Sequence, residues 1–290
     1  MTQAPEQTML MRNRPMSARD WGELLEVSGV TMVDAEVGQL AIVPDRGQLT
    51  LSWAFTDIDM MRLHYQAMFD ALKPAIAEAD VDFITLDFVQ VQNRDWLIPL
   101  LDATDFRFFA EWIDMTHPGL DAEAIPEFSD GVTMRRATDE DVDRIYEIWT
   151  QAYGELTRSP GTFDYFLDHQ TWIGVLEHDG EIVAFGINGP VQAAVGEIFD
   201  AAVAPEARGN GYGRLVLAAA AYQLTTQEAR RATIRVRPDI KQALRICSEL
   251  GFKPGTAGLE YRRSTDEEAI EQRRTERRLA GVKARFGDWR

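Results

Sequence analysis

The chain has 290 residues, enough for two ordinary domains, and its 45% hydrophobic content is typical of a globular protein with a sizeable core. Its formal net charge of −17 disfavours binding to nucleic acid or to an anionic membrane, and would attract cationic small molecules if it does more than keep the chain soluble. No stretch approaches the ~20 apolar residues of a spanning helix, and the single cysteine, Cys247, excludes an intrachain disulfide. We therefore expect a cytoplasmic protein without membrane contact.

Two parts of the chain resemble each other weakly. Arg14–Trp21 matches Arg135–Val142, with small and acidic residues before a first apolar helix position. Further on, Thr104–Phe106 matches Leu250–Phe252. Chance similarity between two mixed stretches is the alternative explanation, but the common order of the elements favours a tandem duplication.

The predicted elements follow this repeat in chain order. The first copy has a strand at Phe83–Val89 and a helix at Trp96–Leu101. The second copy is clearer, because apolar residues alternate in its strands and recur with helical spacing in its helices. Its strands are predicted at Val132–Arg136, Thr171–Glu177, Glu181–Asn188, Val195–Val203, Ala232–Arg237 and Leu259–Arg263, and its helices at Thr138–Gly154, Tyr212–Thr226 and Ile240–Leu250.

These elements predict an α/β fold with a central mixed sheet flanked by helices, present twice in tandem. Residues 1–118 would form the first domain, 119–131 a linker rich in proline and acidic residues, and 132–263 the second domain. Residues 264–290 would add a charged helix that begins at a capping box, Ser264–Glu267, and ends near Gly281. Its mixed charges suit a solvated helix and are also compatible with a homodimer contact.

A glycine-rich loop joins the strand ending at Val203 to the following apolar helix. Gly209, Gly211 and Gly213 permit a tight turn and a close approach of the backbone to an anion. The helix start would direct unpaired N–H groups at that anion, and Arg208 would add charge-assisted hydrogen bonds. A pyrophosphate is the expected ligand. The spacing alone is weak evidence, but it fits neither a dinucleotide fold nor a kinase-like phosphate loop.

The loop, together with the strand and helix that follow it, resembles a specific protein family. Val203–Val216 is similar to the acyl-CoA signature of the GNAT N-acetyltransferase superfamily, Arg/Gln-x-x-Gly-x-Gly/Ala, which Arg208, Gly211 and Gly213 fill. Val236–Pro238 and Ala243–Phe252 resemble the next strand and helix of that family. The resemblance implies acetyl-CoA as co-substrate and no metal. It places the cofactor-binding residues at Ala202, Val203, Arg208, Gly209, Asn210, Gly211, Tyr212, Gly213 and Arg214.

The first copy lacks this loop. The matching stretch, Phe55–Arg62, has no glycine and contains Asp57 and Asp59, whose carboxylates would repel a pyrophosphate. We therefore expect a degenerate N-terminal domain without a phosphate loop. This arrangement resembles that of tandem GNAT proteins with one silent half, of which mycothiol synthase is one type.

The resemblance also implies how a thioester would be attacked. In GNAT enzymes the strand before the loop leaves a backbone N–H free for the acyl oxygen, and Val203 has that position here. Glu197 resembles the general-base glutamate of the GNAT histone acetyltransferases. Its spacing of six residues from Val203 puts both on one face of a regular strand, where a solvated carboxylate is the alternative. Asp200 would face the other way unless a bulge intervenes, and is the reserve base.

Two positions depart from the family pattern. Cys247 stands where the family often has the tyrosine that protonates the departing thiolate. A thiol with a reference pKa of ~8.5 could donate, although a small buried residue is the alternative. Ile240 replaces an asparagine that often binds the pantetheine arm, so weaker CoA affinity is expected.

The acceptor site is expected around the end of the first helix. Tyr153, Tyr165 and Phe166 lie there in the sequence, although aromatic residues at such positions more often belong to the core. Glu155 and Asp164 could attract a cationic amine.

A metal site is not expected. His64, His117, His169 and His178 have no metal-ligand spacing.

The sequence thus predicts an acyl-CoA-dependent N-acyltransferase acting on a small-molecule amine. A CoA-binding regulatory protein with lost turnover is the alternative, favoured by Cys247 and Ile240. A hydroxyl or hydrazine-like acceptor would keep catalysis but change the product.

Overall fold

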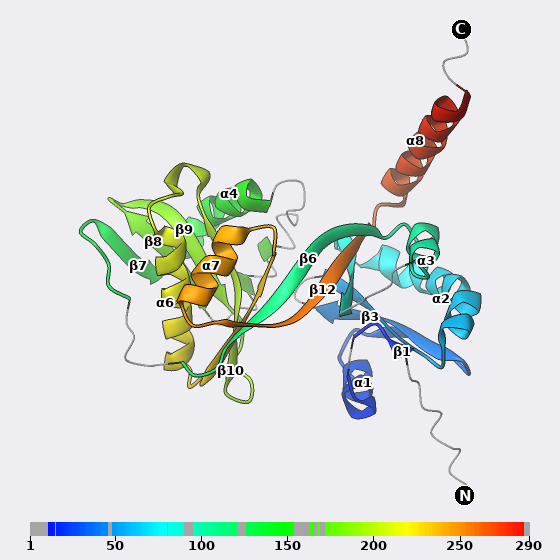
Figure 1. Ribbon diagram of the computed structural model, residues 1–290, viewed down its shortest axis with the longest axis horizontal. Coiled ribbons are helices and arrows are strands. Elements are labelled where there is room, and N and C mark those ends of the chain that lie inside the picture. Colours follow the sequence, from blue (N-terminus) through cyan, green and yellow to red (C-terminus); the bar gives the residue numbers. More distant parts are fainter. Residues whose placement is uncertain are drawn as a thin grey trace, which may run out of the picture. The chain divides into compact units, whose positions relative to one another are not determined.

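The computed structural model describes residues 11–14, 16–45, 48–79, 81–89, 95–120, 126–153, 163–164, 167–168 and 172–286, with side chains up to residue 276 (Figure 1). The chain divides into two compact units. Unit 1 comprises Met1–Phe109 and Leu259–Arg290, and unit 2 comprises Ala110–Gly258. Neither unit is a continuous stretch like the domains expected from the sequence, because two strands each run from one unit into the other.

The two copies of the repeat are α/β structures with the same order of elements. In the first copy the order is β1 (Met11–Arg12), α1 (Ala18–Leu25), β2 (Thr31–Ala35), β3 (Gly38–Asp45), β4 (Gln48–Phe55), α2 (Ile58–Glu78), β5 (Phe83–Val89), α3 (Ile98–Ala103) and β6 (Arg107–His117). In the second copy it is β7 (Val132–Arg136), a 3₁₀ turn η1 (Asp139–Asp141), α4 (Val142–Tyr153), β8 (Trp172–His178), β9 (Glu181–Asn188), β10 (Val195–Val203), η3 (Pro205–Ala207), α6 (Tyr212–Thr226), β11 (Arg231–Val236), α7 (Lys241–Glu249) and β12 (Lys253–Ser264). The helix α8 (Glu267–Phe286) follows.

The sequence matches between the copies coincide with the same local structures. Ser17 with Asp20, and Thr138 with Asp141, each form a capping box at the start of the first helix. Asp105 and Gly251 both adopt a left-handed backbone, with φ of 60° and 94°, after the third helix. The next residue donates its N–H back into that helix, from Phe106 to Leu101 over 2.9 Å and from Phe252 to Cys247 over 3.0 Å. The expected α/β fold in tandem is confirmed.

The sheets reveal an exchange of last strands. In unit 2 the order is β7-β8-β9-β10-β11-β6, and β6 pairs antiparallel with β11 from Val236↔Ile113 to Ala232↔His117. In unit 1 the order is β2-β3-β4-β5-β12. The last strand of each copy therefore completes the sheet that the other copy begins. Leu259 and Tyr261 of β12 accordingly pack in the unit 1 core.

Each core follows from the pattern of its strands. All eight residues of β4 are buried, including the polar Gln48, Thr50 and Ser52, so the strand is covered on both faces. Trp53, Phe69 and Phe106 are among the largest side chains of the unit 1 core. In unit 2 the strands separate two clusters, one around Phe185 and Trp149 and the other around Ile198 and Leu224.

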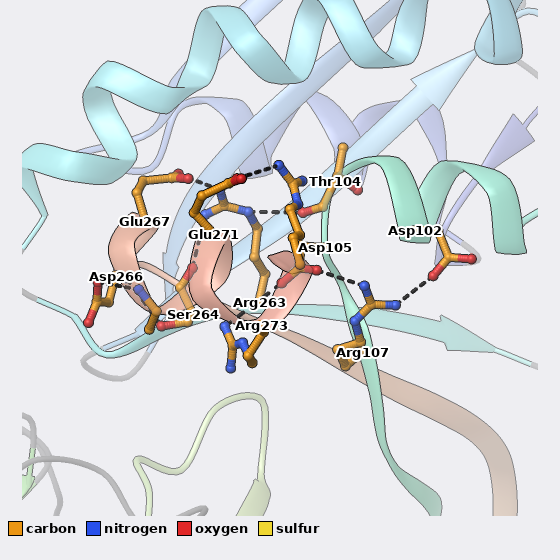
Figure 2. Close-up of polar contacts among 12 residues, drawn as sticks. Asp102, Thr104, Asp105, Arg107, Arg263, Ser264, Asp266, Glu267, Glu271 and Arg273 are labelled. Atoms are coloured by element: carbon orange, nitrogen blue, oxygen red, sulfur yellow. Dashed lines mark hydrogen bonds and ion pairs between the residues drawn. The ribbon is translucent and has the colours of Figure 1, made fainter. Parts of the chain in front are cut away.

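A buried arginine fixes β12 and the start of α8 in unit 1 (Figure 2). Arg263 is only 2% exposed, and it donates from Nε to the Thr104 carbonyl (2.9 Å) and from Nη1 to the Ser264 carbonyl (2.9 Å). Its Nη2 is paired with Glu267. Beside it the buried carboxylate of Asp105 accepts from Arg107 over 2.6 Å. The arginine thus satisfies the carbonyl at the end of α3 while closing the first turn of α8.

The start of α8 differs from the expected capping box. Asp266, rather than Ser264, caps the helix by accepting from the Ala269 N–H over 3.0 Å, while Ser264 Oγ accepts from the Asp266 N–H over 3.1 Å. The helix also continues past Gly281 to Phe286.

We expect Arg263→Ala to lower the free energy of unfolding by about 3 kcal/mol, because the buried Thr104 carbonyl would lose its donor and the side chain would leave a void. Urea denaturation followed by tryptophan fluorescence measures the effect. Arg19→Ala is the matched control, since Arg19 also forms an ion pair but its side chain is 85% exposed. The control should change stability by less than about 0.5 kcal/mol. Equal effects would contradict the anchoring role of Arg263.

Candidate active site

The two parallel strands in the middle of unit 2 separate partway along their length. β10 pairs with β11 from Val195↔Arg231 to Ile198↔Ile234 and no further. Beyond this point Asp200–Val203 pairs only with β9. One edge of the last residues of β10 is therefore open, at the end of the strand that leads into the glycine loop.

The open edge carries the backbone N–H of Val203, which is expected from the family resemblance to bind the acyl oxygen. Ala204 donates its N–H to the Val183 carbonyl on β9 over 2.9 Å. Because N–H groups alternate between the two edges of a strand, Ala202 also directs its N–H at β9 and Val203 directs its own toward the side that β11 leaves. A carbonyl oxygen placed in the gap could accept from Val203.

A β-bulge between Ile198 and Asp200 changes which side chains share a face. Before the bulge, Gly196 lies against Leu224 of α6, so Glu197 points to the opposite face. After it, Asp200 contacts α4, whereas Val203 lies against Gly213 of α6, 3.6 Å from the position that a Cβ there would take. The expectation that Glu197 and Val203 share a face is therefore wrong. Glu197 and Asp200 share one, on the α4 side, because the bulge adds one residue.

Asp200 is held by three hydrogen bonds. The Trp149 indole N–H donates to Oδ2 over 2.8 Å, and the Tyr153 hydroxyl donates to Oδ1 over 2.5 Å. The Ala201 N–H also donates to Oδ1 over 2.8 Å. Two of these donors come from the end of α4, so the carboxylate ties α4 to the bulge of β10. Sequence reasoning missed this contact of Trp149, because its helical spacing resembles that of an ordinary core residue.

The glycine loop has the backbone that an anion site requires. Gly209 and Gly211 have φ of 90° and 83°, which only glycine adopts readily, and a Cβ at either would meet nothing within 4 Å. The space beside them is open. Gly211 is the N-cap of α6 and has no side chain to cap the first N–H groups. Gly213 differs from both, because a Cβ there would make an ordinary van der Waals contact with Ile246 of α7, over 3.4 Å.

The equivalent helix start in unit 1 is closed. Asp57 is the N-cap of α2, and its carboxylate accepts from the Met60 N–H over 2.9 Å. An acidic side chain therefore occupies the position that a phosphate would need, as the sequence comparison indicates.

The side chains of the loop are mostly engaged within unit 2. The buried Tyr212 bonds through its hydroxyl to His178 Nδ1 over 2.7 Å, and Asn210 donates to the Ala207 carbonyl over 3.1 Å. Arg214 forms an ion pair with Glu249 over 3.3 Å. Arg208 is exposed, and its Nε lies 3.4 Å from the Val203 carbonyl. Of the side chains predicted here to bind the cofactor, Arg208 is the one in a position to move onto an anion.

The two departures from the family pattern have different surroundings. Cys247 is buried in the core of unit 2, and burial raises the pKa of its thiol to about 11. Ile240 lies at the start of α7 and is 45% exposed.

Several candidates for the acceptor site lie outside the described residues, namely Glu155, Tyr165 and Phe166, as does His169. Tyr153 is described and contacts Asp200, while Asp164 is exposed. Across the described parts of the chain, histidine, cysteine and acidic side chains form no group of three or more that could hold a metal. No helix in these parts is long and apolar enough to cross a membrane.

Comparison with solved structures finds the same architecture in other proteins. A GCN5-related N-acetyltransferase from Sphaerobacter thermophilus is 18% identical, with a TM-score of 0.57 over 85% of this chain and 84% of that one. Another from Kribbella flavida is 18% identical, with a TM-score of 0.54 over 80% and 88%. A tandem GNAT protein from the clavulanic acid biosynthesis pathway is 13% identical, with a TM-score of 0.54 over 82% and 84%. At these identities the likeness establishes the fold.

The sequence itself matches a family model. Residues 142–252 match the acetyltransferase (GNAT) family, and this range contains α4, the separated strands and the glycine loop. No curated protein matches the chain in sequence. Unit 2 of this chain therefore contains an acetyltransferase domain of the GNAT family.

Proposed function

We propose that unit 2 binds acetyl-CoA, or a close short-chain acyl-CoA, and transfers the acyl group to an amine. One observation carries the proposal: the open edge of β10 at Val203 is joined by a short loop to the uncapped start of α6 at Gly211. The open edge suits the acyl carbonyl, and the helix start suits the pyrophosphate. Bound acetyl-CoA would supply the activated acyl group.

In this proposal three groups of the chain take part in the reaction. The Val203 N–H donates to the acyl oxygen as negative charge develops on it. Glu197 takes the proton that the attacking amine must lose. Asp200, which already accepts from Trp149 and Tyr153, positions the end of α4 and is the reserve base. The shared face of the two carboxylates supports this division.

The departing thiolate is protonated by water in this proposal. When the C–S bond breaks, CoA leaves as a thiolate whose conjugate acid has a pKa near ~8.5. At a pH below this value the thiolate takes its proton from bulk solvent, so the step needs no acid from the protein. The Cys247 thiol is buried in the core, which raises its pKa to about 11 and makes it a poor donor.

A small cationic amine is the acceptor that the charge favours. The net charge of −17 attracts cations from solution, and Asp200 contributes a carboxylate next to the gap. We further propose a cytoplasmic location, since a lone buried thiol suits a reducing compartment.

Acetyl-CoA should raise the melting temperature of the wild-type chain, by roughly 5–10 °C at a hundred times its dissociation constant. Gly211→Glu should abolish this shift, because it places bulk and negative charge where the phosphates would bind. Differential scanning fluorimetry with and without acetyl-CoA measures both.

Gly180→Glu is the matched control for that variant. Gly180 also has a left-handed φ, 85°, with open space around a Cβ, but it lies in the β8–β9 turn. It should lower the melting temperature of the free protein as Gly211→Glu does and keep the acetyl-CoA shift. An unchanged shift in Gly211→Glu would refute the phosphate site.

Glu197→Gln should lower kcat about 100-fold or more, because the amide cannot take the proton that the attacking amine loses. Amine-dependent CoA release, detected with a thiol reagent and corrected for hydrolysis, measures the effect across an amine panel. Asp200→Asn should have a smaller effect on kcat. The reverse order would transfer the role of base to Asp200, and absence of release with every amine would favour a CoA-binding protein without turnover.

Cys247 should react slowly with iodoacetamide in the native chain. At pH 8 a thiol with a pKa of about 11 is about 0.1% ionised, against roughly a quarter for an unfolded thiol at ~8.5, so labelling should be at least about 100-fold slower. The rate should rise as the pH approaches 11. Mass spectrometry with a urea-unfolded control measures it, and similar native and unfolded rates would restore Cys247 as a candidate acid.

A further inference from the structure

The first strand of each copy has a different place in its sheet. In unit 2, β7 pairs with β8 from Val132↔His178 to Arg136↔Gly174, at the edge of the sheet. Its counterpart in the repeat, β1, pairs instead with β4, as Met11↔Phe55 and Arg12↔Ala54. The equivalent edge position beside β2 is taken by no described strand. The first strand of unit 1 has thus moved from the edge to the middle of its sheet.

β1 lies where β4 and β5 separate, which we call the gap of unit 1. β4 and β5 pair in parallel only at Leu49↔Ile84 and Thr50↔Thr85, and then separate as β10 and β11 do. Thr56 donates its N–H to the Val37 carbonyl over 3.1 Å, which directs the N–H groups of Trp53 and Phe55 to the other edge, facing the gap.

The side chain of Asn13 bridges the two walls of this gap. Its Nδ2 donates to the Leu51 carbonyl of β4 and to the Asp87 carbonyl of β5, each over 3.2 Å. Its Oδ1 accepts from the Trp53 N–H over 2.9 Å. Only 5% of Asn13 is exposed, and Arg14 adds an ion pair to the Asp87 side chain. One amide side chain therefore makes hydrogen bonds with three buried backbone groups of the two separated strands.

We propose that Met11–Arg14 is a built-in ligand of unit 1. This segment occupies the gap that the same fold leaves open in unit 2, with strand pairing from Met11 and Arg12 and an amide bridge from Asn13. Unit 1 is therefore closed twice, by Asp57 at the helix start and by its own N-terminal segment between the strands. The proposal rests on the proposed function of unit 2 in one respect, because that function identifies an acyl-CoA as the ligand that unit 1 excludes.

The chemistry of the bridge requires an amide. An aspartate at position 13 would set a carboxylate against two carbonyl oxygens, and an alanine would leave all three backbone groups unpaired. Asn13→Ala and Asn13→Asp should therefore both open the gap, although the second side chain has nearly the same shape as asparagine.

Hydrogen–deuterium exchange of the full chain, followed by mass spectrometry, tests the proposal. In both variants, peptides covering Leu51–Phe55 and Phe83–Val89 should exchange about 10-fold faster or more, while peptides from β10 and β11 keep their rates. The melting temperature should fall by roughly 5 °C. Asn188→Ala is the matched control, since Asn188 is equally buried but donates to the Ala220 carbonyl in unit 2. It should leave Leu51–Phe55 unchanged.

A comparison within the wild-type chain covers the case in which a variant does not fold. Without ligand, the peptide around Trp53 should exchange more slowly than the peptide around Val203, because the first gap is filled and the second is open. Equal exchange in the two peptides would overturn the proposal. Unchanged exchange at Leu51–Phe55 in a folded Asn13→Ala protein would overturn it as well. Neither result depends on whether unit 2 turns over acetyl-CoA.

Discussion

The constraint on which both units depend is the short parallel pairing of their two middle strands. β10 and β11 are paired over four residues, and β4 and β5 over two, before the strands separate. Each separation exposes backbone groups inside a sheet, and buried groups of this kind need partners. Unit 1 meets the need with Asn13, and unit 2 leaves Val203 available for a ligand. The same separation of two parallel strands is thus filled by Asn13 in one copy and is a candidate active site in the other.

The helix starts beyond the two gaps diverge in the same direction. α2 begins at Asp57, which uses its own carboxylate on the first N–H groups, whereas α6 begins at Gly211, which has no side chain to offer. A helix start has a partial positive charge, so an acidic side chain already satisfies the first helix start, whereas no capping side chain covers the second. The strand order adds that β6, the last strand of the first copy, completes the sheet of unit 2, while unit 1 receives β12, held by the buried Arg263.

The geometry beside the gap also places residues that are close in sequence on different faces of the sheet. The bulge in β10 turns Asp200 toward α4, where Trp149 and Tyr153 donate to it, and puts Glu197 on the same face. Val203 is left on the α6 face with its N–H toward the gap. The family position for an acid is filled by a thiol with its pKa raised to about 11, so the proton balance of the proposed reaction depends on the carboxylates and on water.

Local requirements were readable from the sequence alone. Gly209 and Gly211 need a left-handed backbone, and the order of the predicted strands and helices indicates the repeat; both depend on neighbours in the chain. Tertiary structure alone decided the bulge, which is a register against β9, and the exchange of β6 and β12, which joins residues more than a hundred positions apart. It also moved β1 into the gap and buried Tyr212 and Cys247. Strand pairing of this kind depends on which distant segment pairs with a strand, and a local sequence pattern does not identify that segment.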